Sequence, residues 1–167
     1  ITRISTVGNS KSKHGFALKN GRLRYWSDLD GRHLSRDFIF DGGESGVLDF
    51  WASMAYADSP KILLETVEGY VIFTKDNFGY DVLQPLSGGT LPHSPDQIGI
   101  IEFGDEDTVM ALKDGEIYFD GVFADEFLAN MPAELSSGGV SEIAVGSYAA
   151  LAVKDGELHV WGGSSSP

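Results

Sequence analysis

The chain has 167 residues, of which 42% are hydrophobic and 11% aromatic, a balance typical of a folded domain with its own apolar core. Its 25 acidic residues outnumber the 12 basic ones and give a net charge of −13, which repels phosphate backbones and argues against nucleic-acid binding. The absence of cysteine excludes disulfides and thiolate metal sites, and no apolar run reaches the ~18–20 residues that cross a bilayer.

A short phrase recurs four times along the chain, each time ending on a glycine. The four versions are ALKNG at 17–21, TVEG at 66–69, ALKDG at 111–115 and AVKDG at 152–156, with a spacing of about 45 residues. Asn-Gly and Asp-Gly favour two-residue type I′ turns, because both central residues need positive φ. Each phrase therefore predicts a β-hairpin, with a looser turn at Glu68-Gly69.

Short strands are predicted on both sides of each turn. Apolar residues stand at the second and fourth positions after each turn glycine, the alternation of a strand whose apolar side chains share one half-buried face. They are Leu23 and Tyr25, Val71 and Phe73, Ile117 and Phe119, and Leu158 and Val160. A further strand that ends in a small residue is expected upstream of each hairpin, and only residues 125–131 indicate a short helix.

These elements define four units, approximately residues 1–45, 46–95, 96–137 and 138–167, each with three or four antiparallel strands. One such sheet cannot bury both of its faces, whereas sheets stacked around an axis can. The sequence predicts an all-β fold, a single β-propeller domain of about four blades. An arc of a larger propeller, or half of a ring that a second chain completes, is the alternative. In a closed ring, residues 1–8 are expected to complete the last blade and cover its edge.

The repeat carries further markers. The first copy contains Gly8, His14, ALKNG and Trp26, and the last contains Gly146, LAVKDG at 151–156 and VWGG at 160–163. This pattern resembles the repeat of RCC1-like β-propellers, which implies a propeller fold. The G-Q-L-G stretch that usually follows the aromatic residue is missing from every copy, so nucleotide-exchange and chromatin roles do not carry over. His14 is expected to be a structural histidine that hydrogen-bonds within its own unit.

Candidate site residues follow the first hairpin. Asp28, Asp30 and His33 lie just after Trp26, within DLDGRHLSRD at 28–37. Oxygen ligands at alternate positions are typical of calcium loops, but a third acidic ligand before the glycine and a later glutamate are absent. A solvated turn is the better interpretation, and we expect neither a metal nor another cofactor.

Two tryptophans occupy the same place in their units. Trp26 and Trp161 stand five residues after the turn glycine, where the second and third units carry Thr74 and Asp120. Because polar residues are tolerated there, we expect the position to be partly exposed and both tryptophans to be contact residues. His159 is expected to point outward from its strand.

No catalytic motif is present: the chain lacks G-x-S-x-G, H-E-x-x-H and a P-loop. We therefore predict no enzyme but a binding or structural module, which presents loops on a rigid propeller to another protein or a cell-surface receptor, with self-association as a further option. The acidity, the degenerate repeats and the lack of cysteine favour an extracellular or virion-surface component, such as a phage tail part, over a cytoplasmic protein. The alternative is a carbohydrate-active hydrolase or lectin that uses loop carboxylates and tryptophans.

Overall fold

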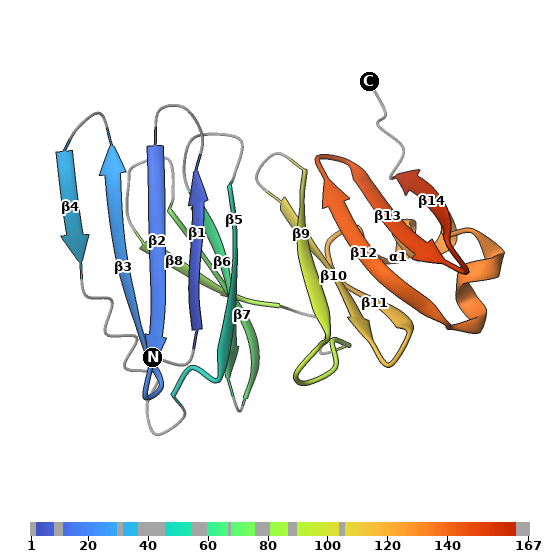
Figure 1. The fold of residues 1–167 in the computed structure, drawn as a ribbon, viewed down its shortest axis with the longest axis horizontal. Coiled ribbons are helices and arrows are strands. Elements are labelled where there is room, and N and C mark those ends of the chain that lie inside the picture. The colour runs from blue at the N-terminus through green and yellow to red at the C-terminus, as the bar shows by residue number, and fades with distance from the viewer. Residues whose placement is uncertain are drawn as a thin grey trace. The chain divides into compact units, whose positions relative to one another are not determined.

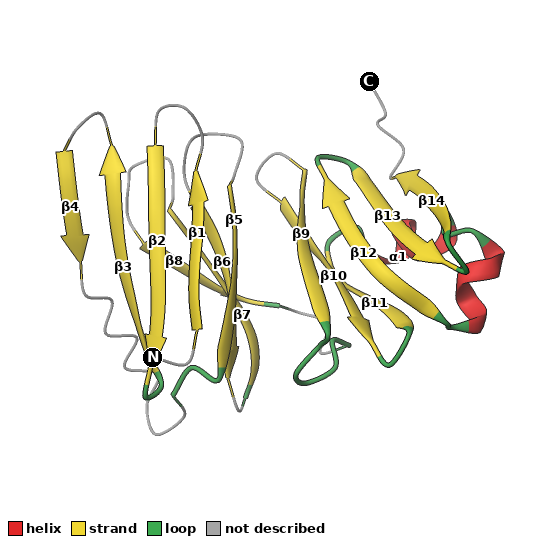
Figure 2. Ribbon diagram, in the orientation of Figure 1, coloured by secondary structure: helices red, strands yellow, loops and turns green. Residues whose placement is uncertain are grey.

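The computed structural model of the protein describes residues 3–8, 12–29, 32–36, 46–54, 60–66, 68–75, 81–86, 90–103 and 106–162. Within these ranges the chain forms two four-stranded and two three-stranded sheets, with one short α-helix and one 3-10 helix (Figures 1 and 2). The all-β class predicted from the sequence is confirmed. The chain divides into two compact units, residues 1–85 and 86–167.

The first unit contains two four-stranded sheets. In both of them each strand pairs antiparallel with the next one in the sequence. The first sheet comprises β1 (Arg3–Gly8), β2 (Ser12–Lys19), β3 (Arg22–Leu29) and β4 (Arg32–Arg36). The second comprises β5 (Asp49–Met54), β6 (Pro60–Thr66), β7 (Gly69–Lys75) and β8 (Asp81–Pro85).

The second unit contains two three-stranded sheets of the same sequential, antiparallel kind. The third sheet comprises β9 (Gln97–Phe103), β10 (Glu106–Lys113) and β11 (Glu116–Gly121), and the fourth comprises β12 (Val140–Gly146), β13 (Ala149–Lys154) and β14 (Glu157–Gly162). Between the two sheets the chain forms α1 (Ala124–Ala129) and the 3-10 helix η1 (Ala133–Ser137). The short helix expected at 125–131 is thus confirmed, one residue early.

Three of the four hairpin turns have the expected geometry. The residue before the turn glycine has φ of 52° in each case, at Asn20, Asp114 and Asp155, and the following glycine also has positive φ. The second hairpin differs in register: Gly69 already belongs to β7, where it pairs with Thr66. In the other copies the glycine is the last residue of the turn, whereas here it is the first residue of the strand. Residues counted from this glycine therefore lie one position further along the strand than in the other copies.

The expectation that residues 1–8 complete the last blade is wrong. Strand β1 pairs with β2 along its length, from Arg3 opposite Leu18 to Gly8 opposite Lys13, and so belongs to the first sheet. Only a few residues connect these two strands. Closing this short loop costs much less chain entropy than bringing the first strand to the other end of the chain.

The two sheets of each unit pack face to face. We call the face that carries the second and fourth residues of the second hairpin strand (β3, β7, β11 or β14) the forward face of a sheet, and the opposite one its backward face. In the first unit the forward face of the first sheet packs on the backward face of the second; this core contains Phe16, Leu18, Leu23 and Tyr25 against Phe50, Ile62, Leu64 and Phe73.

The second unit repeats this arrangement. The forward face of the third sheet packs on the backward face of the fourth; this core contains Met110, Leu112, Ile117 and Phe119 against Ala150, Ala152 and Trp161, with Phe127 of α1 and Leu135 of η1. The same positions of the repeat therefore form the sheet-to-sheet core in both units. Burial of such apolar area is the main stabilising contribution to each unit.

Candidate protein-binding surface

Trp26 lies on the backward face of the first sheet, where its side chain is 40% exposed. It pairs across β2 and β3 with Gly15. A Cβ atom placed on Gly15 would lie 2.2 Å from the nearest carbon of the indole ring, so the ring rests directly on this glycine. A glycine at this place is what allows the indole to lie against the strand rather than stand away from it.

The register of the sheet surrounds Trp26 with a defined set of neighbours. Ile4 pairs with Ala17, and Ala17 pairs with Arg24, which forms the adjacent row on the same face. Ile4 is 61% exposed. We call Ile4, Ala17, Arg24 and Trp26 the Trp26 surface.

Basic side chains border the Trp26 surface. Alternation along β2 and β3 places Lys13, Lys19 and Arg22 on the backward face together with Arg24, and all four are exposed. In a chain with a net charge of −13, this face is the place where cations gather. An apolar centre with a cationic border suits a partner that offers apolar and acidic groups.

The other candidates of the 28–37 segment lie beside Trp26 in the backbone. Asp28 follows two residues after Trp26 on β3, and it pairs with His33 on β4 and with Lys13 on β2. Asp30 lies outside the described residues, as do the side chains of Asp28 and His33. The register thus brings Trp26, Asp28 and His33 to one end of the first sheet.

Trp161 has a different environment. Its side chain is only 8% exposed, its Nε1 donates a hydrogen bond of 3.1 Å to the carbonyl oxygen of Phe127, and its ring meets Phe119 edge-on at 6.3 Å. The exposure expected at this position is therefore correct for Trp26 and wrong for Trp161. His159 shares the face of Trp161 and is partly buried, so its expected outward orientation is also wrong. The reason is that the third sheet and α1 cover this face.

His14 has the structural role expected for it. It is buried in the first sheet, its Nδ1 lies 2.8 Å from the Tyr25 hydroxyl, and the two rings stack with centroids 5.8 Å apart. A buried polar side chain is tolerated when it is hydrogen-bonded in this way. The His14–Tyr25 pair lies on the forward face of the first sheet, on the opposite side from Trp26.

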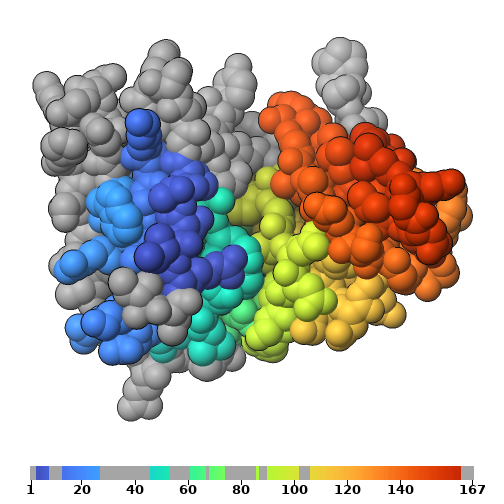
Figure 3. Space-filling view, viewed as in Figure 1, coloured from blue at the N-terminus to red at the C-terminus, as the bar shows by residue number. Residues whose placement is uncertain are grey.

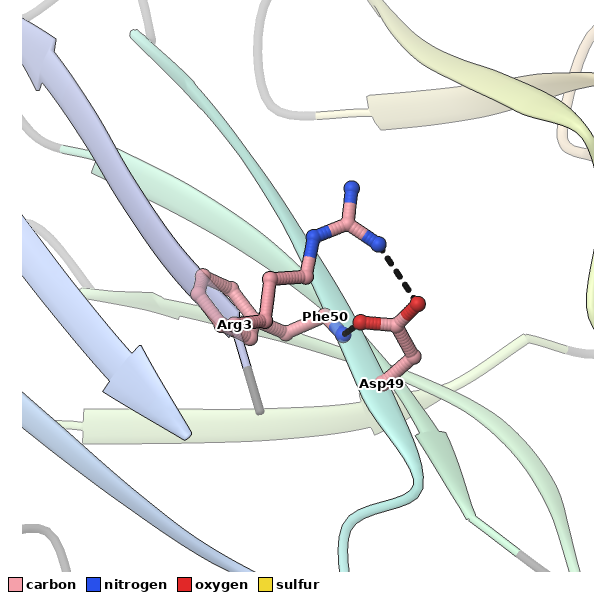
Figure 4. A network of polar contacts seen from close by, with 3 residues as sticks. All are labelled: Arg3, Asp49 and Phe50. Atoms are coloured by element: carbon pink, nitrogen blue, oxygen red, sulfur yellow. Dashed lines mark hydrogen bonds and ion pairs between the residues drawn. The ribbon is translucent and has the colours of Figure 1, made fainter. Parts of the chain in front are cut away.

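An ion pair that the sequence did not reveal links the first two sheets (Figure 4). Arg3 on β1 contacts Asp49 on β5 at 2.5 Å, and the other Asp49 oxygen accepts a 2.8 Å hydrogen bond from the Phe50 backbone N–H. The guanidinium also lies 5.0 Å from the ring centroid of Trp51 and 5.8 Å from that of Phe50. Trp51 is partly buried, and its ring also lies 6.3 Å from that of Tyr70.

Within the described ranges, no three His, Asp or Glu side chains are grouped closely enough to hold a metal ion. The described carboxylates that are buried, Glu65 and Asp120, lie in different units, and Asp120 accepts a 3.2 Å hydrogen bond from the Thr90 backbone N–H. Burial, followed by the charges of Glu65 and Asp49, raises the pKa of Tyr70 well above its usual range. Glu65, Asp120 and Tyr70 all lie outside the Trp26 surface.

In the part of the chain that the structure describes, neither helix has the length or apolar character needed to span a membrane. No protein-family model matches the chain, and no curated protein is significantly similar to it.

Proposed function

We propose that the chain is a non-catalytic binding or structural module that recognises another protein or a cell-surface receptor through the Trp26 surface and the adjoining ends of β3 and β4. The observation that supports this most is an exposed tryptophan resting on Gly15, with Ile4 and Ala17 beside it and cations around it. Tryptophan and arginine are the residues most often found to dominate protein interfaces.

The arrangement of Trp26 favours binding because its side chain would lose little conformational entropy when a partner binds. Its ring already lies against a strand of a four-stranded sheet, so a partner need not immobilise it. Asp30 follows β3 directly in the sequence, and residues between the strands of a sheet are common recognition elements. The basic border attracts an acidic partner and orients it on approach.

The repeat also supports a propeller as the scaffold. The sheets are formed by consecutive antiparallel strands and stack face to face through the same repeat positions in both units, which is the organisation of propeller blades. We propose RCC1-like blades, about four in this chain, that form an open arc rather than a ring closed within one chain, which leaves the Trp26 surface accessible, and that act outside the cell or on a virion surface.

A capture experiment tests this function. The immobilised chain is exposed to protein from its native source, alongside Trp26→Ala and Gly15→Ala, whose new methyl group displaces the indole without removing it. Leu128→Ala on α1 is the matched control, because it truncates an exposed apolar side chain elsewhere. We expect capture to persist in the control and to fall at least ~10-fold in both first-sheet variants.

A glycan array separates this function from the carbohydrate alternative, which the exposed indole also favours because sugars stack on aromatic rings. Glycan retention that depends on Trp26 without protein capture would identify a lectin, and release of a shortened glycan would identify a hydrolase. Protein capture that is unchanged in Trp26→Ala would contradict the proposed surface.

A further inference from the structure

The fourth sheet has an exposed aliphatic face. Leu158 and Val160 on β14 are 63% and 59% exposed. They pair with Val153 and Leu151 on β13, and Leu151 pairs in turn with Ala144 on β12. We call these five residues the aliphatic face; the residues of β12 to β14 are coloured orange to red in the space-filling view of Figure 3. A contiguous apolar patch on a folded chain marks an interaction site.

The aliphatic face is the forward face of its sheet. Leu158 and Val160 are the second and fourth residues of β14, as Leu23 and Tyr25 are of β3. Leu23 and Tyr25 are buried against the second sheet, and the corresponding face of the third sheet is buried against the fourth. The fourth sheet therefore has the side chains of a packing face, of which Leu158 and Val160 are exposed and Leu151 and Val153 partly buried.

The hairpin turns also indicate that the forward face of the fourth sheet is uncovered. The carbonyl oxygen of Gly21 accepts a 3.1 Å hydrogen bond from Val47, at the entry to the second sheet. Gly115 accepts one of 3.0 Å from Val140, at the entry to the fourth sheet. At Gly156, the equivalent glycine of the last hairpin, a Cβ atom would meet nothing within 4 Å.

The first sheet carries the complementary face. Trp26 is the fifth residue of β3, and its counterpart Trp161 is the fifth residue of β14, which packs on the preceding sheet. The backward face of the first sheet is therefore suited to pack on a forward face.

Charge favours this pairing as well. The Trp26 surface has a basic border, whereas the aliphatic face has Glu142 opposite Val153 and Asp155 at the adjoining turn. Opposite charges around two apolar centres orient the faces and exclude like-charged alternatives.

We propose that the aliphatic face of one chain docks on the Trp26 surface of a second copy, repeating between molecules the sheet-to-sheet packing found within each unit. This inference rests on the proposed function, since it names a partner for the Trp26 surface. Because two different faces meet, the contact is heterologous and produces a ring where its rotation closes, or a filament where it does not.

Two charge substitutions test the pairing in the full chain. Trp26→Glu places a negative charge in the centre of the Trp26 surface, which is expected to meet Val160 of the other copy as Trp161 meets Phe119. Val160→Lys places a positive charge on the aliphatic face, which is expected to meet the surface with the basic border. Both sites are exposed, so both variants are expected to fold. Circular dichroism and thermal unfolding provide an independent check of folding. Val122→Lys, an equally exposed apolar position outside both faces, is the matched control.

Sedimentation equilibrium over a range of concentrations gives the result. The wild type and Val122→Lys are expected to increase in mass with concentration, whereas each of the other variants stays monomeric, with association weakened by ~30-fold or more. An equimolar mixture of the two monomeric variants is expected to form a heterodimer and nothing larger, because one variant keeps its aliphatic face and the other its Trp26 surface.

Several outcomes would overturn the proposal. A wild type that remains monomeric, or a mixture that forms no heterodimer, rules out head-to-tail pairing. Self-association that survives in Trp26→Glu but not in Val160→Lys shows that two aliphatic faces meet each other. If the chain is monomeric yet captures another protein in a Trp26-dependent way, the second copy is the wrong partner and the proposed function stands. Loss of that dependence as well removes both.

Discussion

Trp26 and Trp161 occupy the same position in two copies of one hairpin, yet one is 40% exposed and the other 8%. Both strands follow a turn of the same type, and both have apolar residues at alternate positions. The difference arises outside the repeat: a preceding sheet and α1 cover the backward face of the fourth sheet, and the backward face of the first sheet has an exposed centre. A repeat position thus acquires its role from the neighbour that packs on it.

The largest expected effect separates the two tryptophans directly. Trp161→Ala should lower the free energy of unfolding by about 3–5 kcal/mol, because it leaves a cavity beside Phe119 and removes the hydrogen bond to Phe127. Trp26→Ala, at an exposed site, should change it by less than ~1 kcal/mol. Denaturant unfolding of both variants measures this, and similar losses would contradict the comparison.

The hairpin turns allow a second comparison. Gly115 and Gly156 have φ of 82° and 81°, but a Cβ atom would approach the Gly139 nitrogen to 3.1 Å only at Gly115. Valine at either position is strained by about 1–3 kcal/mol, and we expect Gly115→Val to show the larger loss in thermal unfolding. An unchanged melting temperature in Gly115→Val would remove the positive-φ account of the turn.

The sequence predicts the hairpins well because their causes are local. Asn-Gly and Asp-Gly need only their own backbone to set the turn, and Asn20, Asp114 and Asp155 all have the expected positive φ. The interaction of His14 within its sheet is similarly close in the chain, eleven residues from Tyr25.

The sequence could not predict which faces are covered. Leu158 and Val160 follow the same alternation as Leu23 and Tyr25, so a pattern that assigns a core face treats both pairs alike. Their exposure depends on what packs on that face, which is tertiary information. Trp161 was predicted to be exposed because a polar residue, Asp120, stands at the equivalent place in the third unit. Asp120 is itself buried and hydrogen-bonded, so a polar residue at this position does not indicate exposure.

A pH comparison concerns Tyr70, the second residue of β7 and the counterpart of Leu23. Its pKa in the folded chain is raised by burial and by the charges of Glu65 and Asp49, so the unfolded chain loses the phenolic proton first. The stabilising contribution is complete below about pH 10 and decreases as the pH rises above it, by at most ~1.4 kcal/mol per pH unit. Tyr70→Phe should flatten this slope in alkaline unfolding curves, and an unaltered slope would assign it to another group.

The smallest expected effect distinguishes the polar contacts that link the two sheets of the first unit from those that link the two sheets of the second. Arg3 and Gln97 hold the same register position, opposite Leu18 and Leu112, but Arg3 makes an ion pair whereas Gln97 exchanges hydrogen bonds with Ile143 and Ser141. Because the ion pair is partly exposed, Arg3→Ala should cost about 0.5–1 kcal/mol at low salt and less at high salt. Gln97→Ala should show no such salt dependence in urea unfolding, and equal salt responses would refute the distinction.

The central claim, that one repeat position is core in the fourth sheet and contact surface in the first, is tested most directly by fluorine NMR of the chain with 5-fluorotryptophan. Trp26→Phe and Trp161→Phe assign the signals, and a soluble paramagnetic probe reports the exposure of each indole. At low protein concentration the Trp26 signal should broaden strongly while that of Trp161 remains sharp, and raising the concentration should protect Trp26 alone. Equal broadening of the two signals in the dilute sample would contradict the account.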